Sequence, residues 1–367
     1  MELDILPLDQ WLTSPLQPLI ISGPCSAESE EQVMTTAREL ARIPQVKVFR
    51  SGIWKPRTRP DGFQGVGSHG LAWLQKVKAE TGLLTAVEVA NPKHIEQALS
   101  FGIDILWIGA RTVVNPFSMQ EISDCLKDVD IPVMVKNPIH PDIKLWIGAL
   151  ERLNKSGIRK LVAVHRGFHY FQEQAYRNSP MWEIPIELKR LHPNLPVICD
   201  PSHISGKRNG IMAVAQKALD LDMEGLMIES HCDPDAALTD ALQQLRPEDL
   251  GKMLNELIVR RSSGDNFFQN RLDELRTEVD KIDWELLGIL NKRMKIVEEI
   301  GEYKKANDIT VLQIRRWRDI IVDRMELGIK LGLDKDFLLH MLELIHQESI
   351  RKQMDILNWP PKQEEGG

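Results

Sequence analysis

Residues 19–26 read LIISGPCS, a short apolar run that closes on a glycine and opens into a polar tip. A run so short and so continuously apolar is typical of a parallel strand that is buried on both faces. The same unit, an apolar run followed by a polar tip and a helical pattern, recurs along most of the chain. The runs occupy residues 19–23, 46–49, 83–87, 105–109, 132–135, 160–164, 196–199 and 225–228.

Eight such units within about 240 residues fit an α/β fold of the TIM-barrel type, whose usual size is about 250 residues. An open, doubly wound sheet is the rival architecture, but the even spacing of the runs favours closure. We therefore predict a (β/α)8 barrel over residues 1–260. Catalytic groups of such a barrel stand at the carboxyl ends of its strands, so the residues that follow each run are the candidates for a site.

The chain changes character after the barrel. Residues 261–266 form a short polar linker, and residues 267–357 have a helical pattern throughout. Residues 358–367 have the composition of a flexible tail. We therefore expect two domains of unlike architecture, which agrees with a length of 367 residues.

Apolar residues recur every seven positions over residues 266–306, which predicts one long helix with an apolar seam. Two shorter helices are expected over residues 313–331 and 336–357. The long helix would run about 60 Å, which exceeds the width of a compact domain of about 100 residues. It cannot bury its seam against its own domain, so we predict an all-α domain that forms a homodimer. The seam consists of Phe268, Leu272, Leu275, Val279, Ile282, Leu286, Ile289, Arg293, Ile296 and Ile300.

Composition excludes several classes of protein. A net charge of −7 argues against nucleic acid as the main partner. No run approaches the roughly 18 apolar residues of a membrane span, and the first residues lack the basic start of a signal peptide. The four cysteines stand far apart and form no CxxC pair. A reducing cytoplasm is therefore the expected location, with no membrane partner.

Cations gather behind the predicted strands. Six like charges at one barrel mouth repel one another unless an anion neutralises them. Arginine suits both phosphate and carboxylate geometry, so the expected substrates carry several such groups. The six cations are Arg50, Lys55, Arg57, Arg111, Lys136 and Arg166.

A mixed set of sulfur, nitrogen and oxygen donors accompanies these cations: Cys25, His203, Glu229 and Asp240. The set is too hard for copper(I) and too soft for magnesium alone, so it predicts a divalent metal, with manganese, iron, zinc and cobalt all open. His231 is the rival imidazole for this site, and we favour His203.

The strand-end motifs carry a family resemblance: GPCS at residues 23–26, GAR at 109–111, HRG at 165–167 and DPSH at 200–203. Together they resemble the 3-deoxy-D-arabino-heptulosonate 7-phosphate (DAHP) synthases of the type I beta group, which is shared with the 3-deoxy-octulosonate 8-phosphate synthases. Those enzymes condense phosphoenolpyruvate with a phosphorylated aldose and use a divalent metal. The resemblance implies Mn²⁺ first, with Fe²⁺, Co²⁺ or Zn²⁺ as alternatives, held by Cys25, His203, Glu229 and Asp240.

The resemblance also implies roles for the remaining residues at the mouth. Arg111 and Arg166 would bind the phosphate of phosphoenolpyruvate beside Ala110. Asp200 would lie near the aldehyde, and Glu88 near the water that attacks C2. The carboxylate of phosphoenolpyruvate would lie near the cations Arg50, Lys55 and Lys136.

The choice of aldose rests on Lys55-Pro56-Arg57-Thr58. This run is similar to that of the DAHP synthases, in which the arginine and threonine hold the phosphate of erythrose 4-phosphate. The octulosonate synthases differ here and take the longer arabinose 5-phosphate. Arg59 departs from the family, which commonly has a small residue there.

Arg293 interrupts the apolar seam of the long helix. It either extends its head to water or, as a desolvated cation, needs an anion. Lys304 returns to nearly the same face eleven residues later, and Ser349 and Gln353 share a face of the last helix. The pattern indicates a small polar pocket.

This pocket resembles that of the all-helical chorismate mutases, which are intertwined dimers. The resemblance implies that Arg293 and Arg276 of the partner subunit bind the substrate carboxylates. Lys304 and Gln353 would hydrogen-bond the ether oxygen of chorismate, and Arg316 and Ser349 would complete the pocket. Gln313 and Trp317 depart from the acids that the family often has near the substrate hydroxyl.

The sequence is thus interpreted as a bifunctional enzyme of the shikimate pathway, which supplies aromatic amino acids. The barrel would condense phosphoenolpyruvate with erythrose 4-phosphate, and the helical domain would convert chorismate to prephenate. Alternatively, the helical domain is chiefly a dimerising sensor of chorismate or prephenate that regulates the barrel allosterically. An octulosonate synthase barrel is the weaker alternative.

Overall fold

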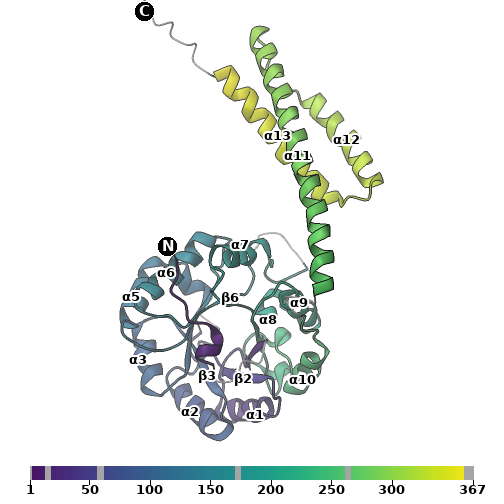
Figure 1. The fold of residues 1–367 in the computed structure, drawn as a ribbon. Helices are drawn as coiled ribbons and strands as arrows, with labels where there is room; N and C mark the ends of the chain where they lie inside the picture. The colour runs from purple at the N-terminus through teal and green to yellow at the C-terminus, as the bar shows by residue number, and fades with distance from the viewer. Residues whose placement is uncertain (1, 13–17, 56–61, 170–174, 261–265, 359–367) are drawn as a thin grey trace, which may run out of the picture. The chain divides into compact units, whose positions relative to one another are not determined.

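A computed structural model describes residues 2–12, 18–55, 62–169, 175–260 and 266–358. The chain divides into two compact units, Met1–Ser262 and Ser263–Gly367. The first unit is an α/β barrel and the second is all helical (Figure 1). Each unit is described by itself below.

Eight parallel strands close the barrel of the first unit in chain order, from β1 round to β8. Closure occurs where β1 pairs with β8, with Leu19 opposite Gly225 and Gly23 opposite Glu229. The predicted TIM barrel is confirmed, and the doubly wound alternative is wrong. The strands are β1 (Leu19–Gly23), β2 (Val46–Arg50), β3 (Leu84–Val89), β4 (Ile105–Ile108), β5 (Val133–Lys136), β6 (Leu161–His165), β7 (Val197–Cys199) and β8 (Gly225–Glu229).

Helices surround the strands (Figure 1) and cover their outer faces, as parallel strands require. Several begin with a side-chain cap: Ser29, Asn91 and Asp142 each accept a backbone N–H of the first turn. The helices of the barrel unit are α1 (Glu30–Leu40), α2 (His69–Thr81), α3 (Pro92–Ser100), α4 (Ala110–Val113), α5 (Pro116–Cys125), α6 (Ile143–Lys155), α7 (Glu183–Leu191), α8 (Pro201–Ser205), α9 (Arg208–Asp220) and α10 (Pro247–Glu256).

The interior of the barrel is filled by side chains. Ile21, Val48, Trp107, Met134 and Ile198 belong to one buried cluster inside the barrel, which also includes Leu12. This packed floor leaves room for polar groups only at the carboxyl end of the strands.

The last residue of several strands is charged. Arg50, Lys136 and Glu229 are the last residues of β2, β5 and β8, one residue beyond the predicted runs. A charged side chain is costly inside a sheet, but the ends of these strands face polar partners at the barrel mouth. The predicted runs therefore end one residue too early at these three strands, because a charged residue is not expected inside a sheet.

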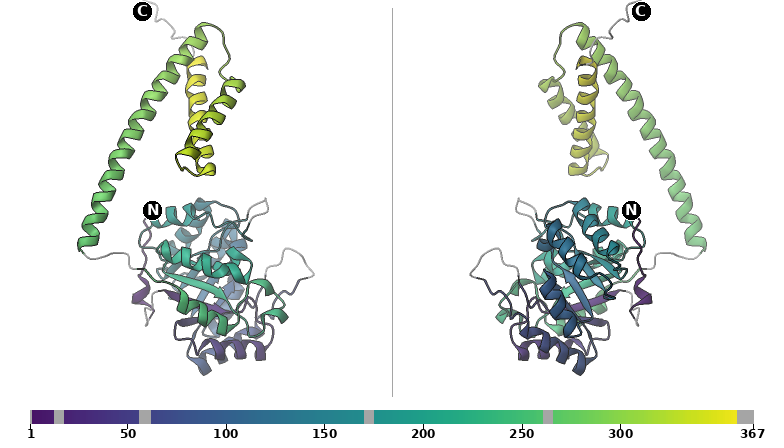
Figure 2. Two further views of the ribbon diagram at one scale, coloured as in Figure 1. Left: turned by 90° about the vertical axis from the view of Figure 1, so that its right-hand side faces the viewer. Right: turned by 90° about the vertical axis from the view of Figure 1, so that its left-hand side faces the viewer.

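The second unit has one long helix and two shorter ones, α11 (Asn266–Ala306), α12 (Ile314–Lys330) and α13 (Lys335–Asn358). These match the predicted helices to within one residue. In Figure 2, α13 lies beside the second half of α11, where Lys352 forms an ion pair with Glu298 at 2.6 Å. None of the helices among the described residues has an apolar stretch that could cross a bilayer.

Candidate active sites

A cavity of about 490 Å³ opens at the mouth of the barrel. Its walls come from the ends of different strands and from the segments that follow them, so closure of the barrel is what brings them together. Six predicted catalytic or substrate-binding residues and two predicted metal ligands line it: Lys55, Glu88, Ala110, Arg111, Lys136, Arg166, His203 and Asp240. Arg50 lies below the cavity with 1% of its surface exposed, and its guanidinium carbon is 4.8 Å from the centre of the Trp107 ring.

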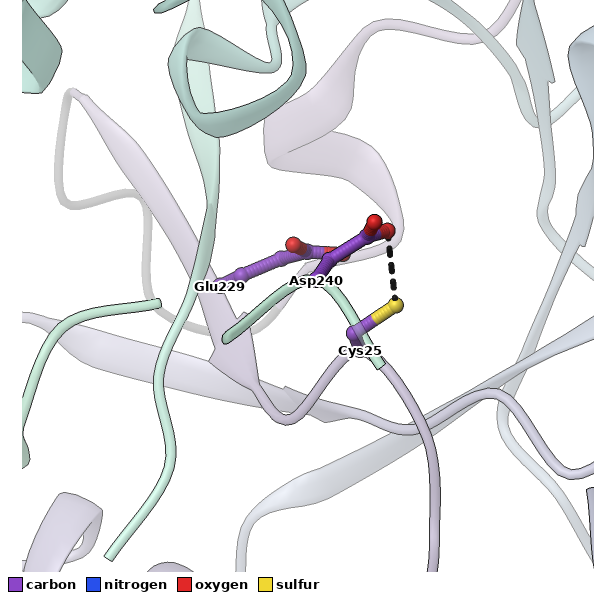
Figure 3. Close-up of side chains that lie close together, drawn as sticks. All are labelled: Cys25, Glu229 and Asp240. Atoms are coloured by element: carbon purple, nitrogen blue, oxygen red, sulfur yellow. Dashed lines mark hydrogen bonds between the residues drawn. The ribbon is translucent and has the colours of Figure 1, made fainter. Parts of the chain in front are cut away.

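Three of the four predicted metal ligands form a tight group. Ligand atoms of Cys25, Glu229 and Asp240 all lie within 4.8 Å of one another (Figure 3). The Cys25 thiol donates to Oδ2 of Asp240 at 3.3 Å. Oε1 of Glu229 is buried and has no hydrogen-bond partner among the described residues. A buried anionic oxygen beside a sulfur and a second carboxylate is a donor set that fits a divalent cation.

His203 falls outside this group of three but borders it. Its Nε2 is 3.8 Å from Oε1 of Glu229, and its Nδ1 is 2.8 Å from Oδ2 of Asp200. The DPSH motif explains this placement, because Asp200 caps α8 by accepting the backbone N–H of His203 at 3.1 Å. Because Nδ1 lies against a carboxylate, Nε2 is the ring atom that faces the group formed by Cys25, Glu229 and Asp240.

His231, the rival imidazole, is directed elsewhere. Its Nδ1 accepts the backbone N–H of Asp233 at 2.9 Å, and its Nε2 is 3.7 Å from a carboxylate oxygen of Glu28. Its Nδ1 is therefore engaged by the backbone, and its Nε2 faces Glu28 rather than the group formed by Cys25, Glu229 and Asp240.

Each side chain of the group has a cation beside it. Nζ of Lys55 is 3.1 Å from the Cys25 sulfur, and Nη1 of Arg50 is 3.5 Å from Oε1 of Glu229. Asp240 pairs through Oδ1 with Arg177 at 3.0 Å. These cations hold the acidic side chains together where repulsion alone would separate them.

Burial and neighbouring charges shift the pKa values at this site. Burial, helped by Glu229, raises the pKa of the Cys25 thiol to about 12, so without a metal the sulfur is protonated. Burial opposes the charged form of Asp240, but His203 and Arg177 outweigh it and hold the pKa of this carboxyl below its usual range. Burial likewise opposes the charge on Lys55, yet Cys25 and Glu88 raise its pKa.

The cationic side of the cavity centres on Arg166. Its Nη1 donates to Asn178 at 2.7 Å, and its backbone N–H donates to Asn137 at 2.7 Å. Burial lowers the pKa of Arg166 to about 10, and Arg177 and Arg111 act in the same direction. An anion bound here would relieve this clustering of positive charge.

Gly109 is required by its neighbour on β3. A Cβ atom at this position would lie 2.1 Å from Oε1 of Glu88, so the glycine of the GAR motif leaves space for that carboxylate. Glu88 and Arg111 are thereby brought to the same wall of the cavity.

Two predicted residues of the sugar-phosphate run, Arg57 and Thr58, lie outside the described residues, as does Arg59. Lys55, which opens that run, is described: its Nζ also donates to the backbone oxygen of Cys25 at 2.8 Å.

The helical unit brings a second group of predicted residues together. Nη1 of Arg293 donates to the Ser349 hydroxyl at 2.7 Å, which joins α11 to α13. The Gln353 amide is buried, and its oxygen has no partner among the described residues. Burial, aided by Arg324, lowers the pKa of the half-buried Arg293. Lys304 donates to the backbone oxygen of Val311 at 2.6 Å.

Other predicted residues of this pocket stay on the surface of the single chain. Arg276 is exposed and lies 3.4 Å from Asp273, and Arg316 is exposed on α12. Of the two positions that depart from the mutase pattern, Trp317 stacks on His346 with ring centres 3.7 Å apart, and Gln313 precedes α12 without a side-chain cap.

Comparison with known families decides the identity of the barrel. The sequence profile of the DAHP synthetase I family matches residues 14–262.

The chain belongs to the DAHP synthetase I family.

A second profile, that of chorismate mutase type II, matches residues 275–354, so this family member also carries a chorismate mutase domain. The fusion of the two enzyme domains, both of the shikimate pathway, agrees with the interpretation of the sequence.

Individual relatives match the barrel of this family member. A phospho-2-dehydro-3-deoxyheptonate aldolase of Thermotoga maritima is 31% identical over 238 residues, which is 65% of this chain and 68% of the relative. A 2-dehydro-3-deoxyphosphooctonate aldolase of Desulfatibacillum aliphaticivorans is 28% identical over 265 residues, with 67% of this chain and 92% of the relative covered. The crystal structure of a DAHP synthase from Thermotoga maritima has a TM-score of 0.58 at 30% identity, over 65% of this chain and 67% of that one.

The sequence did not predict Arg177 or Gln243, although both contact carboxylates of the group formed by Cys25, Glu229 and Asp240 in this DAHP synthetase I barrel. Arg177 pairs with Asp240, and the Gln243 amide donates to Oε2 of Glu229 at 2.7 Å. Arg177 stands twelve residues beyond β6 in a connection without a recognisable motif. The only signal for Gln243 is its closeness in sequence to Asp240.

His165 of the HRG motif predicts a pH dependence of stability. It is fully buried between the rings of Phe168 and Trp182, and burial lowers its pKa to about 3. The unfolded chain protonates near pH 6.5 but the folded barrel does not, so this stability is complete above pH 6.5 and is lost as the pH falls towards 3. Between pH 7.5 and 5 the expected loss is about 2 kcal/mol.

Urea unfolding of the wild type and of His165→Leu at both pH values measures this loss. The variant should lose about 2 kcal/mol less than the wild type between the two pH values, because its side chain does not titrate. His140→Leu, at an exposed histidine, is the matched control and should behave as the wild type. Equal losses in the wild type and His165→Leu would contradict the prediction.

Proposed function

We propose that the barrel condenses phosphoenolpyruvate with erythrose 4-phosphate to give DAHP and phosphate, and that the helical unit converts chorismate to prephenate. The observation that carries the first activity is the cavity in which Arg111, Arg166 and Lys136 face the donors Asp240 and His203. An anionic substrate and a carbonyl activated at the donor group would meet there. The proposal places the enzyme in the cytoplasm.

A divalent metal, Mn²⁺ first, held by Cys25, His203, Glu229 and Asp240, would supply Lewis acidity to the aldehyde carbonyl. Arg166 and Arg111 bind the phosphate of phosphoenolpyruvate, and Lys136 binds its carboxylate. Arg50, held below the cavity against Trp107, adds positive charge to that end. The substrate is thereby oriented with its C3 towards the aldehyde.

Proton transfers in the condensation fall to Lys55 and Glu88. C3 of phosphoenolpyruvate forms a bond to C1 of the aldose while Lys55, kept protonated by its raised pKa, donates a proton to the aldehyde oxygen. Water adds to C2 beside Glu88, and phosphate leaves with the bridging oxygen, so the new ketone oxygen comes from water. Asp200, which pairs with Lys136 at 2.7 Å, lies next to His203 and so near the aldehyde.

Substrate length tests the choice of aldose. We expect kcat/KM for erythrose 4-phosphate to exceed that for arabinose 5-phosphate by at least about tenfold, the discrimination that one extra carbon commonly gives. Arg57→Ala should raise KM for erythrose 4-phosphate and leave KM for phosphoenolpyruvate unchanged, because Arg57 is proposed to hold the distal phosphate. Equal or reversed preference in a phosphate-release assay would favour an octulosonate synthase.

The helical unit needs no nucleophile or general base, because the rearrangement of chorismate is pericyclic. Arg293 is proposed to bind a carboxylate, and Lys304 and Gln353 to stabilise negative charge on the ether oxygen. Ser349 and Arg316 would complete the pocket, with Arg276 of the partner subunit. An assay for prephenate formation by the intact protein distinguishes this mutase from a sensor without catalysis, which would form none.

We further propose that the helical unit forms a homodimer along the seam of α11. Ile282 and Ile289, at the centre of the seam, are 63% and 61% exposed in the single chain. Apolar seams of this length are rarely left in water. Light scattering should give twice the mass of the chain, and Ile282→Lys with Ile289→Lys should give a monomer. Asp280→Lys, on the opposite face of the same helix, should leave the dimer intact; a monomeric wild type would contradict the proposal.

A further inference from the structure

Arg177 is linked to both carboxylates of the group formed by Cys25, Glu229 and Asp240. Its Nη1 is 3.0 Å from Oδ1 of Asp240, and the same atom donates to the side-chain oxygen of Gln243. The Gln243 amide nitrogen donates to Oε2 of Glu229 at 2.7 Å. One guanidinium therefore reaches Asp240 directly and Glu229 through a single amide.

Asp240 occupies a backbone conformation that needs support. Its φ of 49° and ψ of 36° place it in the left-handed region, where residues other than glycine are uncommon. Its carboxylate is held on both sides, because Oδ2 accepts the Cys25 thiol and Oδ1 pairs with Arg177. Loss of either contact would free the carboxylate to turn away from Cys25.

Arg177 is itself held by the segment that carries His203. A Cβ atom at Gly206, where φ is +69°, would lie 2.4 Å from Cβ of Arg177. The next residue, Asn178, donates to the backbone oxygen of His203 at 2.6 Å and accepts from Arg166 at 2.7 Å. Arg177 thus lies at a fixed place between the cationic wall of the cavity and the donor group.

The charge of Arg177 and its geometry would act on a bound cation in opposite directions. Its positive charge repels the cation, but 46% of the side chain is exposed, so water screens that repulsion. Its hydrogen bonds to Asp240 and Gln243 are directional and are not weakened in this way. The orienting effect is therefore the larger of the two.

We propose that Arg177 is a positioning residue that orients Asp240 and Glu229 for metal binding and so sets the metal affinity of the barrel. The inference rests on the metal-dependent condensation proposed above. Groups that orient metal ligands in this way commonly change affinity by about 10- to 100-fold when they are removed.

The test is a Co²⁺ titration of the metal-free, full-length protein. The sulfur-to-cobalt charge-transfer band reports ligation by Cys25 without any turnover, and competition with a chelator gives the dissociation constant. Arg177→Gln should bind Co²⁺ about 10- to 100-fold more weakly than the wild type. Arg177→Lys keeps the charge but loses the planar guanidinium whose Nη1 donates to both Asp240 and Gln243, and should weaken binding by a similar factor. Circular dichroism of the same samples, compared with the wild type, shows that the barrel is folded.

Arg246→Gln is the matched control, because Arg246 lies in the same β8–α10 connection as Asp240 but pairs with Asp233, at 3.2 Å. It should bind Co²⁺ as the wild type does. Equal or tighter binding by Arg177→Gln would overturn the inference, as would unchanged affinity together with a raised KM for phosphoenolpyruvate, which would make Arg177 a substrate ligand. A wild type that binds no Co²⁺ would instead overturn the proposed function of the barrel, and the inference with it.

Discussion

Cys25→Ala is expected to lower condensation at least about 1000-fold, or about 4 kcal/mol in activation free energy, while chorismate rearrangement continues at the wild-type rate. The sulfur of Cys25 is buried and lies close to Glu229 and Asp240, so its loss would remove one of the proposed ligands. A chelator should have the same effect on the wild type. Phosphate release from phosphoenolpyruvate and prephenate formation, measured on one sample, separate the two activities.

Cys125→Ala is the control for this prediction. Cys125 is half-buried on α5, and its sulfur contacts the backbone oxygen of Pro92 rather than the cavity. Both activities of this variant should be close to those of the wild type. Condensation at the full rate by chelator-treated, metal-free protein would show that the assignment of the metal ligands is wrong.

Arg293→Ala is expected to have the second largest effect, on the other activity. Truncation of one partner of a buried charge pair costs about 2–5 kcal/mol, which corresponds to a loss of about 30- to 5000-fold in prephenate formation. Condensation in the barrel should be unchanged. Arg293 donates to Ser349 and is half-buried, an arrangement that favours the proposed carboxylate contact over extension into water.

A mixture of two variants tests whether the pocket is shared between chains. Arg276→Ala and Arg293→Ala homodimers should each be inactive as mutases, because every pocket lacks one arginine. In mixed dimers one pocket lacks both residues and the other lacks neither, so equal mixing should restore about a quarter of the wild-type activity. Failure of mixing to restore activity would place both arginines in one chain's pocket, whereas an active Arg276→Ala homodimer would show that Arg276 has no role. An Arg293→Ala variant with full mutase activity would show that Arg293 only extends into water.

The barrel and the three terminal helices could be predicted because their signals are local. The run at Leu19–Gly23 and the seven-residue repeat of α11 each specify an element without reference to distant residues. The bounds of β2 and β8 were short because Arg50 and Glu229 resemble loop residues when only their neighbours in sequence are considered. Only the closed barrel supplies the partners, 3.5 Å apart, that allow both charges to end buried strands.

Strand-end motifs likewise identified most of the residues that line the cavity, since their chemistry and their place after a strand are both visible in the chain. The motifs specified neither the cation that lies beside each proposed metal ligand nor the place of Arg177. Cys25, Arg177 and Asp240 come from three separate connections, and their distances depend on how the barrel closes.

Periodicity and composition along the chain were sufficient for the fold class, the division into two units and the kinds of chemistry present. The tertiary structure decided which imidazole borders the donor group. Nδ1 of His203 lies against the Asp200 carboxylate, whereas Nε2 of His231 faces Glu28. It also left Arg276 on the surface of the single chain, away from Arg293. A hydrophobic pattern is a property of neighbours in sequence. The role of a polar side chain depends instead on distances of a few ångströms between segments that are far apart in the chain, and only folding sets these distances.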